Sequence, residues 1–330
     1  MIVLKMLLKK VFEDNASDLH LIEGTAPTER INGEIIKIRD IPFADGKKLI
    51  QDLLSEKQKQ QLADQGDVDA SYEIEIIPGI MLRCRVNVYK DSTGLSFAFR
   101  LIPDKIPSMD DLQFPMGMRR MVREHHGLIL ITGPTGSGKT TTLAAMLQDI
   151  ANHRRGKIIT LEDPIEYKLQ PSQSIISQRE IGINCRNFAT GLKAALRQDP
   201  DVIMVGELRD AETIETALAA AETGHLVLAT LHTATVIEAV DRITQYFPVS
   251  DRKTLLMELA NSFVGIVAQR LFAKKKGGRI AAFEVLTRND ATINMIRSDA
   301  IFRCSDYMRP EQGMQTMEHA IQGLKNLGLI

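Results

Sequence analysis

The fold is decided by the stretch Leu128-Ile-Leu-Ile-Thr-Gly133-Pro-Thr-Gly-Ser-Gly-Lys-Thr140, in which an apolar run passes directly into a glycine-rich loop. Its spacing matches the P-loop pattern in full, and it lies between a predicted strand at 127–132 and a predicted helix at 141–150. Glycines allow the backbone to wrap a phosphate with its N–H groups turned inward, and the helix N-terminus adds positive potential. We therefore predict a nucleotide phosphate site made of Gly133, Pro134, Thr135, Gly136, Ser137, Gly138, Lys139, Thr140 and Thr141.

Two side chains of this loop have a predicted chemical role. Lys139 has the length to reach the β and γ phosphates, and the Thr140 hydroxyl is placed to hold Mg²⁺. The alternative interpretation of the loop is a glycine-rich turn that binds no ligand. Such a turn would need neither Lys139 nor Thr140, so the presence of both favours the phosphate site. The expected cofactors are ATP and Mg²⁺.

Further apolar runs indicate an α/β fold. The runs at 157–161, 202–205 and 226–231 alternate with helical patterns, which is typical of a parallel sheet covered by helices. From about residue 251 onward we expect mainly helix. A smaller α+β domain is predicted at 1–102, and its expected elements are strands at 18–22, 30–38, 70–77, 80–90 and 95–102, a turn at Asn32-Gly33 and one helical stretch at 45–65. Residues 103–111, with two prolines and four charges, form the expected linker to 112–330.

Acidic residues and histidines follow the predicted strands at the end where ligands gather in open α/β sheets. Glu162, Asp163 and Glu166 come after the first run, and the alternative for them is a solvated loop. Glu207 ends the second run where many P-loop enzymes have Asp. It is a candidate metal residue, and whether its contact with the metal is direct or passes through water stays open. The third run is flanked by His225 and His232. Both are candidate catalytic residues. A structural role stays open as the alternative for His225, whereas His232 is well placed to sense a phosphate.

Composition excludes several classes of protein. The chain of 330 residues has 41 Lys and Arg against 42 Asp and Glu, and it has no Trp, unlike proteins that track single-stranded nucleic acid. A basic run at 274–279 is the best support for a DNA translocase. No run reaches the ~18 apolar residues that span a bilayer, and residues 1–12 indicate an amphipathic helix rather than a signal peptide. Three widely spaced cysteines fit a reducing compartment, so a cytoplasmic location is expected.

Four segments together resemble the secretion ATPase superfamily of type II secretion and type IV pilus motors. Residues 133–142 are similar to its Walker A motif, 160–167 to its Asp box, 201–207 to its Walker B motif and 224–233 to its His box. The resemblance extends to 16–20, 83–87, 269–271 and 313–316, and it is strongest to the PilT-like type IV pilus retraction ATPases. Their A-I-R-N-L-I-R-E segment is matched only in part at 292–299. Pilus assembly or type II export therefore stays open as the alternative to retraction.

The resemblance implies a homo-hexamer whose subunits have a PAS-like N-terminal domain and a RecA-like ATPase domain. It implies that Glu166 is the general base, that Glu162 and Asp163 shape its site, and that Glu207 supports the magnesium ion or the water. It also implies ATP over GTP, a platform protein at the inner face of the inner membrane, and possibly a second retraction or assembly ATPase as partners, without direct binding of nucleic acid.

Three arginines of the first domain have two interpretations. Arg83 and Arg85 lie two residues apart in one predicted strand and share a face, and Arg100 comes from the next strand. They are expected to neutralise the γ-phosphate, as arginine fingers do in other P-loop enzymes, with the linker as hinge. The alternative is a solvated sheet face.

Overall fold

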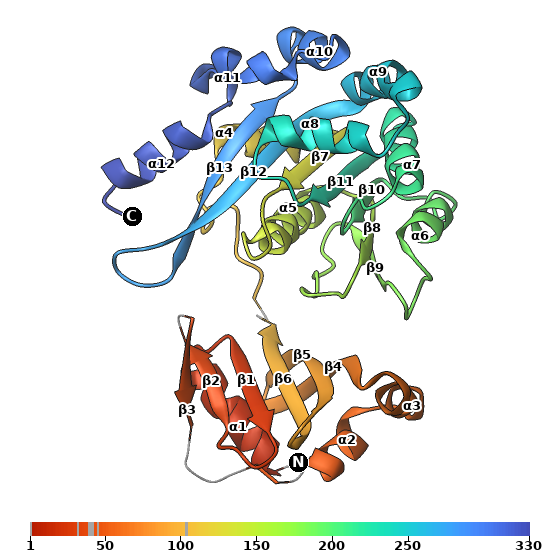
Figure 1. Ribbon diagram of the computed structural model, residues 1–330. Helices are drawn as coiled ribbons and strands as arrows, with labels where there is room; N and C mark the ends of the chain where they lie inside the picture. The colour runs from red at the N-terminus through yellow and green to blue at the C-terminus, as the bar shows by residue number, and fades with distance from the viewer. Residues whose placement is uncertain (1, 32, 39–42, 45, 103–104) are drawn as a thin grey trace. The chain divides into compact units, whose positions relative to one another are not determined.

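The computed structural model describes residues 2–31, 33–38, 43–44, 46–102 and 105–330, which fall into two compact units, Met1–Lys105 and Ile106–Ile330 (Figure 1). The predicted linker at 103–111 begins with Pro103 and Asp104, which lie outside the described residues. Its role as a hinge stays a prediction. We describe each unit by itself.

The first unit is an antiparallel sheet covered by helices on one face. Its strands are β1 (Asp18–Ile22), β2 (Thr28–Ile31), β3 (Glu34–Lys37), β4 (Asp67–Ile77), β5 (Ile80–Asp91) and β6 (Gly94–Ile102), in the order β3-β2-β1-β6-β5-β4. The helices are α1 (Ile2–Glu13), α2 (Gly46–Leu53) and α3 (Glu56–Gln65). Alternate residues of β5, such as Cys84 and Val86, are buried beneath the helices, which leaves the other face of the sheet polar. The predicted α+β class of this unit is confirmed.

The single helix predicted at 45–65 is wrong. Two helices are present, because the Ser55 hydroxyl accepts a hydrogen bond from the backbone N–H of Gln58 and the Gln58 side chain accepts one from the Ser55 N–H. This reciprocal capping starts a new helix at Glu56. The predicted helical stretch begins at Asp45, and the first predicted turn includes Asn32. Both residues lie outside the described residues.

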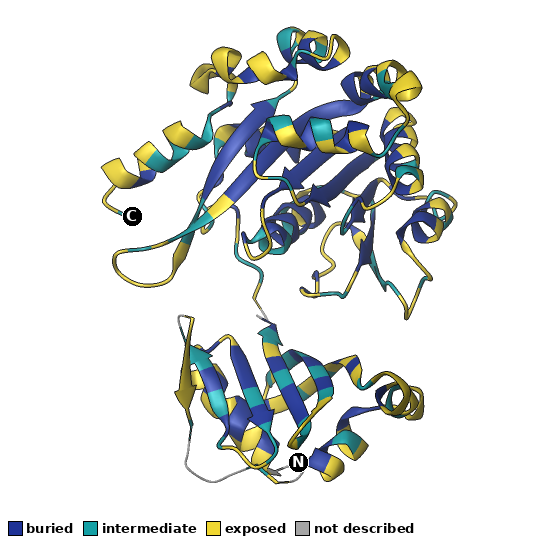
Figure 2. Cartoon of the chain, viewed as in Figure 1, coloured by how far each residue is buried: buried dark blue, intermediate teal, exposed yellow. Residues whose placement is uncertain are grey.

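The second unit is a seven-stranded sheet with helices on both faces. Its strands are β7 (Gly127–Thr132), β8 (Lys157–Glu162), β9 (Ile175–Glu180), β10 (Val202–Val205), β11 (Leu226–Leu231), β12 (Phe263–Ala273) and β13 (Arg279–Thr287), in the order β13-β12-β7-β11-β10-β8-β9. All neighbours are parallel except β12 and β13. Figure 2 shows that the central strands are almost entirely buried. The predicted parallel sheet is confirmed.

Two apolar layers hold the helices on this sheet. One layer holds α4 (Met116–Met121) and α5 (Lys139–His153). The other holds most of the remaining helices, which are α6 (Phe188–Ala195), α7 (Ala211–Glu222), α8 (Val236–Gln245), α9 (Arg252–Ser262), α10 (Asp290–Arg297) and α11 (Cys304–Tyr307). Helix α12 (Met317–Asn326) packs on β13. Within the described residues, no helix is long and apolar enough to cross a bilayer.

The expectation of mainly helix after residue 251 is also wrong, because β12 and β13 form a long antiparallel pair there. Residues 263–269 of β12 are all buried, since this strand lies between β7 and β13 with helices on both faces. A strand buried on both faces shows no alternation of apolar and polar residues, so its pattern cannot be told from that of a buried helix. Strand β9 was not predicted either, because its half-buried polar residues give no apolar run.

Candidate functional site

The parallel strands bring the predicted site residues to one edge of the sheet. Because β7, β8, β10 and β11 all run in the same direction, their carboxyl ends lie side by side. The P-loop follows β7, the segment from Glu162 to Glu166 follows β8, Glu207 follows β10 and His232 follows β11.

Lys139 lies at the start of α5 with its amine inside the loop. Its Nζ donates hydrogen bonds to the carbonyl oxygens of Gly133 at 2.7 Å and Pro134 at 3.2 Å. Burial lowers the pKa of this ammonium by removing water from it, and the charges of Glu207 and Glu166 oppose that shift. These two carboxylates are therefore near enough for their charges to act on the lysine.

The loop fits a phosphate by two independent observations. The Ser137 hydroxyl oxygen is buried and finds no hydrogen-bond partner among the residues that the structure describes. Gly136 has φ +78°, which favours glycine, and a Cβ built there would meet nothing within 4 Å. A phosphate oxygen could accept the hydrogen bond that the Ser137 hydroxyl lacks, and the open backbone at Gly136 leaves room for it.

Polar contacts link the P-loop to Glu207. The Glu207 carboxylate pairs with Arg209 at 2.7 Å and with His232 Nε2 at 3.3 Å, and His232 Nδ1 lies 3.5 Å from the Thr135 hydroxyl. Arg209 also lies 4.0 Å from Asp163, and its hydrogen bond to Glu207 raises its own pKa. One chain of contacts thus joins side chains that follow four different strands.

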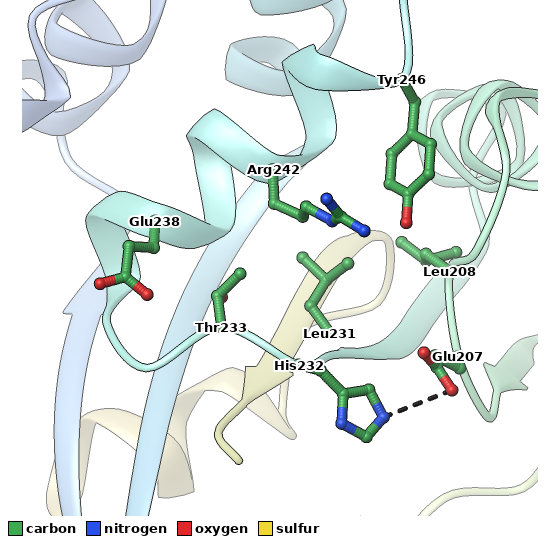
Figure 3. Close-up of a pocket in the computed structure, with 8 residues that line it drawn as sticks. All are labelled: Glu207, Leu208, Leu231, His232, Thr233, Glu238, Arg242 and Tyr246. Atoms are coloured by element: carbon green, nitrogen blue, oxygen red, sulfur yellow. Dashed lines mark ion pairs between the residues drawn. The ribbon is translucent and has the colours of Figure 1, made fainter. Parts of the chain in front are cut away.

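A pocket of about 240 Å³ adjoins this chain of contacts. Figure 3 shows Glu207 and His232 at its base, with Arg242 and Tyr246 from the end of α8 on the opposite wall. The Arg242 guanidinium lies over the Tyr246 ring, 4.9 Å from its centroid. His232 therefore lines an open pocket and lies beside Glu207.

The carboxylates that follow β8 differ in their surroundings. Glu162 is buried, and its Oε1 accepts hydrogen bonds from the Thr160 hydroxyl at 2.5 Å and from Gln178 Nε2 at 3.0 Å. Burial raises the pKa of Glu162. Glu166 is exposed. Of the two, Glu166 has the carboxylate that water and a nucleotide can reach.

His225 does not belong to this group of residues, which corrects the expectation of a catalytic role. It precedes β11, so it lies at the amino edge of the sheet, about 20 Å along the strand from His232. Its Nδ1 lies 2.9 Å from the carbonyl oxygen of Ala220 and meets the end of α7. This contact fits a structural role for His225.

The arginines of the first unit lie on the polar face of their sheet, as alternation predicted. Each is paired with a carboxylate of the same unit, and the pairs are Arg83–Glu73 at 2.7 Å, Arg85–Asp69 at 3.2 Å and Arg100–Asp18 at 2.9 Å. Of these pairs, Arg85–Asp69 is exposed on both sides and contributes little to stability. Whether these arginines neutralise a phosphate stays a prediction.

The sequence analysis assigned no role to Gln269. This residue of β12 is hydrogen-bonded to the P-loop and to the start of α5. Its Nε2 donates to the carbonyl oxygen of Ser137 and its Oε1 accepts from the Thr142 hydroxyl, both at 2.7 Å. The residue is only 2% exposed. A lone glutamine inside an otherwise apolar run was the signal, since buried polar side chains are hydrogen-bonded.

Replacing Gln269 with Leu should therefore weaken both folding and nucleotide binding. The change leaves the Ser137 carbonyl and the Thr142 hydroxyl buried without partners, at about 1–3 kcal/mol for each such group. We expect the free energy of unfolding to fall by about 2–6 kcal/mol and the Kd for ADP to rise several-fold. Urea unfolding and titration with a fluorescent nucleotide measure the two effects. Gln322→Leu, the same change at an exposed position of α12, should alter neither, and an unchanged Kd for Gln269→Leu would contradict the role.

The chain is similar to proteins of one family. Residues 1–309 match the family described as type II/IV secretion system protein. The chain is 39% identical over 323 residues to the type IV pilus retraction ATPase PilT of Pseudomonas aeruginosa, covering 96% of this chain and 92% of that protein. It is 38% identical over 309 residues to a twitching motility protein of Neisseria gonorrhoeae, covering 92% and 82%.

A solved structure is similar over almost the whole chain. The crystal structure of the pilus retraction motor PilT with bound ADP matches with a TM-score of 0.90 and 41% identity, over 99% of this chain and 94% of that one. The family match covers most of the chain, and the relatives match it over nearly all of its length. The chain therefore belongs to the type II/IV secretion system protein family and is one of its P-loop ATPases.

Proposed function

We propose that this ATPase is a motor that powers retraction of type IV pili. The observation that carries the proposal is the gathering of Lys139, Glu166, Glu207 and His232 around one P-loop edge, in a chain with near full-length similarity to a pilus retraction ATPase. On the strength of the family resemblance we also propose that the chain forms a homo-hexamer.

Each residue of the site has a separate proposed role in ATP hydrolysis. Lys139 and the loop N–H groups bind the phosphates, and the Thr140 hydroxyl holds Mg²⁺, which when bound neutralises charge on the β and γ phosphates. Glu166 orients the attacking water and takes its proton, which is the task of a general base. Glu207 supports the metal or the water from its place between Arg209 and His232. Asp163 and Glu162 shape the loop that carries Glu166.

The first unit supplies the second half of the proposed motor. Arg83, Arg85 and Arg100 would exchange their present carboxylate partners for phosphate oxygens when ATP binds. The Arg85–Asp69 pair is exposed on both sides and costs little to break, whereas Arg83 and Asp18 are mostly buried in their pairs. An exchange of partners is therefore least costly for Arg85. Closing of the two domains would then follow ATP binding, with the segment at 103–111 as the hinge.

The proposed partners follow from pilus retraction. The hexamer would act on a platform protein at the inner face of the inner membrane, where a second retraction or assembly ATPase could share the machinery. No direct binding of nucleic acid is proposed, because the chain has nearly balanced charge and no Trp.

A deletion strain separates retraction from its alternatives. Loss of a retraction motor should leave cells with more surface pili than the parent and without twitching movement, and the plasmid-borne parent gene should reverse both. Bald cells would favour pilus assembly and overturn the proposal, and piliation and twitching equal to the parent's would overturn it as well. In vitro, stimulation of ATP turnover by DNA would favour a translocase instead.

A further inference from the structure

Strand β9 supplies the contacts that hold the loop carrying Glu166. The chain leaves β8 at Glu162, forms this loop and returns as β9, which pairs in parallel with β8 at the sheet edge. The register places Gln178 opposite Thr160 and Glu180 opposite Glu162. Side chains of β9 therefore stand beside the point where the loop begins.

Two side chains of β9 bind the backbone on both sides of Glu166. Before it, the N–H of Ile165 donates to Glu180 Oε2 at 3.1 Å. After it, Gln178 Nε2 donates to the carbonyl oxygen of Tyr167 at 2.8 Å, and Gln178 Oε1 accepts from the N–H of Leu169 at 2.9 Å. Gln178 also donates to the buried Glu162 carboxylate, so its amide nitrogen makes two hydrogen bonds.

Tyr167, the residue next to Glu166, ties the loop to the P-loop helix. Its hydroxyl lies 2.9 Å from the hydroxyl of Thr141, and its side chain is only 7% exposed. Thr141 directly follows Thr140, so the position of this part of the loop is set relative to the residues expected to hold Mg²⁺. The exposed Glu166 side chain is thus carried on a backbone that is fixed from β9 and from α5.

We propose that Gln178 and Tyr167 are positioning residues for Glu166, a role that rests on the proposed function of Glu166 as general base. A base acts only when its carboxylate is held at hydrogen-bond distance from the water. A displacement of about 1 Å far from the chemistry can cost about 100-fold in rate. Loss of either contact should therefore slow hydrolysis while leaving the phosphate-binding loop intact.

The simpler interpretation is that these bonds only stabilise the loop, and Gln148 provides the matched control. Gln148 of α5 also binds the loop backbone twice, donating to the carbonyl oxygen of Gln170 at 3.0 Å and accepting from its N–H at 2.9 Å. These bonds lie four residues beyond Glu166. A purely stabilising role predicts similar effects for Gln148→Leu and Gln178→Leu, whereas a positioning role predicts an effect on turnover for Gln178 alone.

A double-mutant cycle tests the proposal on the full-length protein. We expect Gln178→Leu to lower kcat for ATP about 10- to 100-fold with the Kd for ATP within about threefold of the parent, while Gln148→Leu keeps the parent kcat. In a Glu166→Gln background, Gln178→Leu should change kcat by less than about threefold, because the positioned group is already absent. Tyr167→Phe, which removes only the hydroxyl, should show the same coupling and serves if Gln178→Leu does not fold.

The outcomes separate this proposal from the function on which it rests. If Glu166→Gln is slow but Gln178→Leu and Tyr167→Phe cost as much in that background as alone, the positioning role is overturned and the base assignment stands. An equal loss of kcat in Gln148→Leu also overturns it. If Glu166→Gln alone turns over ATP at the parent rate, the base assignment fails, and the positioning role fails with it.

Discussion

Lys139→Ala is expected to abolish ATP turnover, lowering kcat/KM by roughly 10³-fold or more. The amine is buried inside the loop against the carbonyl oxygens of Gly133 and Pro134, so it is placed where phosphate charge would lie. In a site shielded from water, one preorganised donor aimed at developing charge is typically worth about 10²–10³ in rate, and here ground-state binding of the phosphates is lost as well. Phosphate release and titration with a fluorescent ATP analogue measure the two losses.

The same change should not unfold the protein. Burial lowers the pKa of Lys139, which means that the folded state destabilises its charged form when no nucleotide is present. The melting temperature of Lys139→Ala without nucleotide should therefore equal or exceed that of the parent, while the increase that ADP gives the parent should disappear. A variant that keeps this ADP-dependent increase would contradict the role of Lys139.

Lys157 offers a matched control on the same sheet. Its amine also donates to a backbone carbonyl, that of Gln198 at 2.6 Å, but it lies at the amino end of β8, the edge opposite the P-loop. Lys157→Ala removes a comparable hydrogen bond, which is part-buried, and should leave turnover near that of the parent. Equal losses in the two variants would show that the effect comes from packing rather than from the phosphate site.

The sequence predicts those parts of the site whose residues lie close to one another, or close to their strand, along the chain. The P-loop is one local segment, and each acid follows its own apolar strand directly, so parallel pairing was enough to bring Glu166 and Glu207 to one edge. His225 shows the limit of this reasoning. It is as near in sequence to β11 as His232 is, yet the two lie at opposite ends of the strand.

The residues that sequence reasoning missed act over long chain separations. Gln269 binds Ser137 across 132 positions, and nothing local in either segment indicates the other. Strand β12, which carries Gln269, was itself expected to be helix because a fully buried strand has no alternation. For Gln178 the difficulty was similar, since β9 is polar and half-buried and gives no apolar run. These contacts become visible only once the order of the strands is known.

Glu166→Gln is expected to separate binding from hydrolysis. The amide keeps the shape of the carboxylate but cannot take a proton, and general-base catalysis typically contributes about 10²–10⁴ in rate. We expect kcat to fall by roughly 10²-fold or more, while the Kd for ATP changes by less than about threefold, because Glu166 is exposed and Lys139 and the loop N–H groups remain in place. Single-turnover hydrolysis together with equilibrium binding of ATP measures both.

Glu162→Gln is the control variant for Glu166→Gln. Glu162 lies four residues away, but it is buried, its pKa is raised by burial, and both Thr160 and Gln178 donate to its Oε1. Glu162→Gln imitates the protonated acid and can still accept a hydrogen bond there, so kcat should fall by less than about tenfold. If instead Glu162→Gln abolishes hydrolysis and Glu166→Gln does not, the base is the buried acid. A carboxyl whose pKa is raised by burial would then take the proton, and the exposed Glu166 would only line the site.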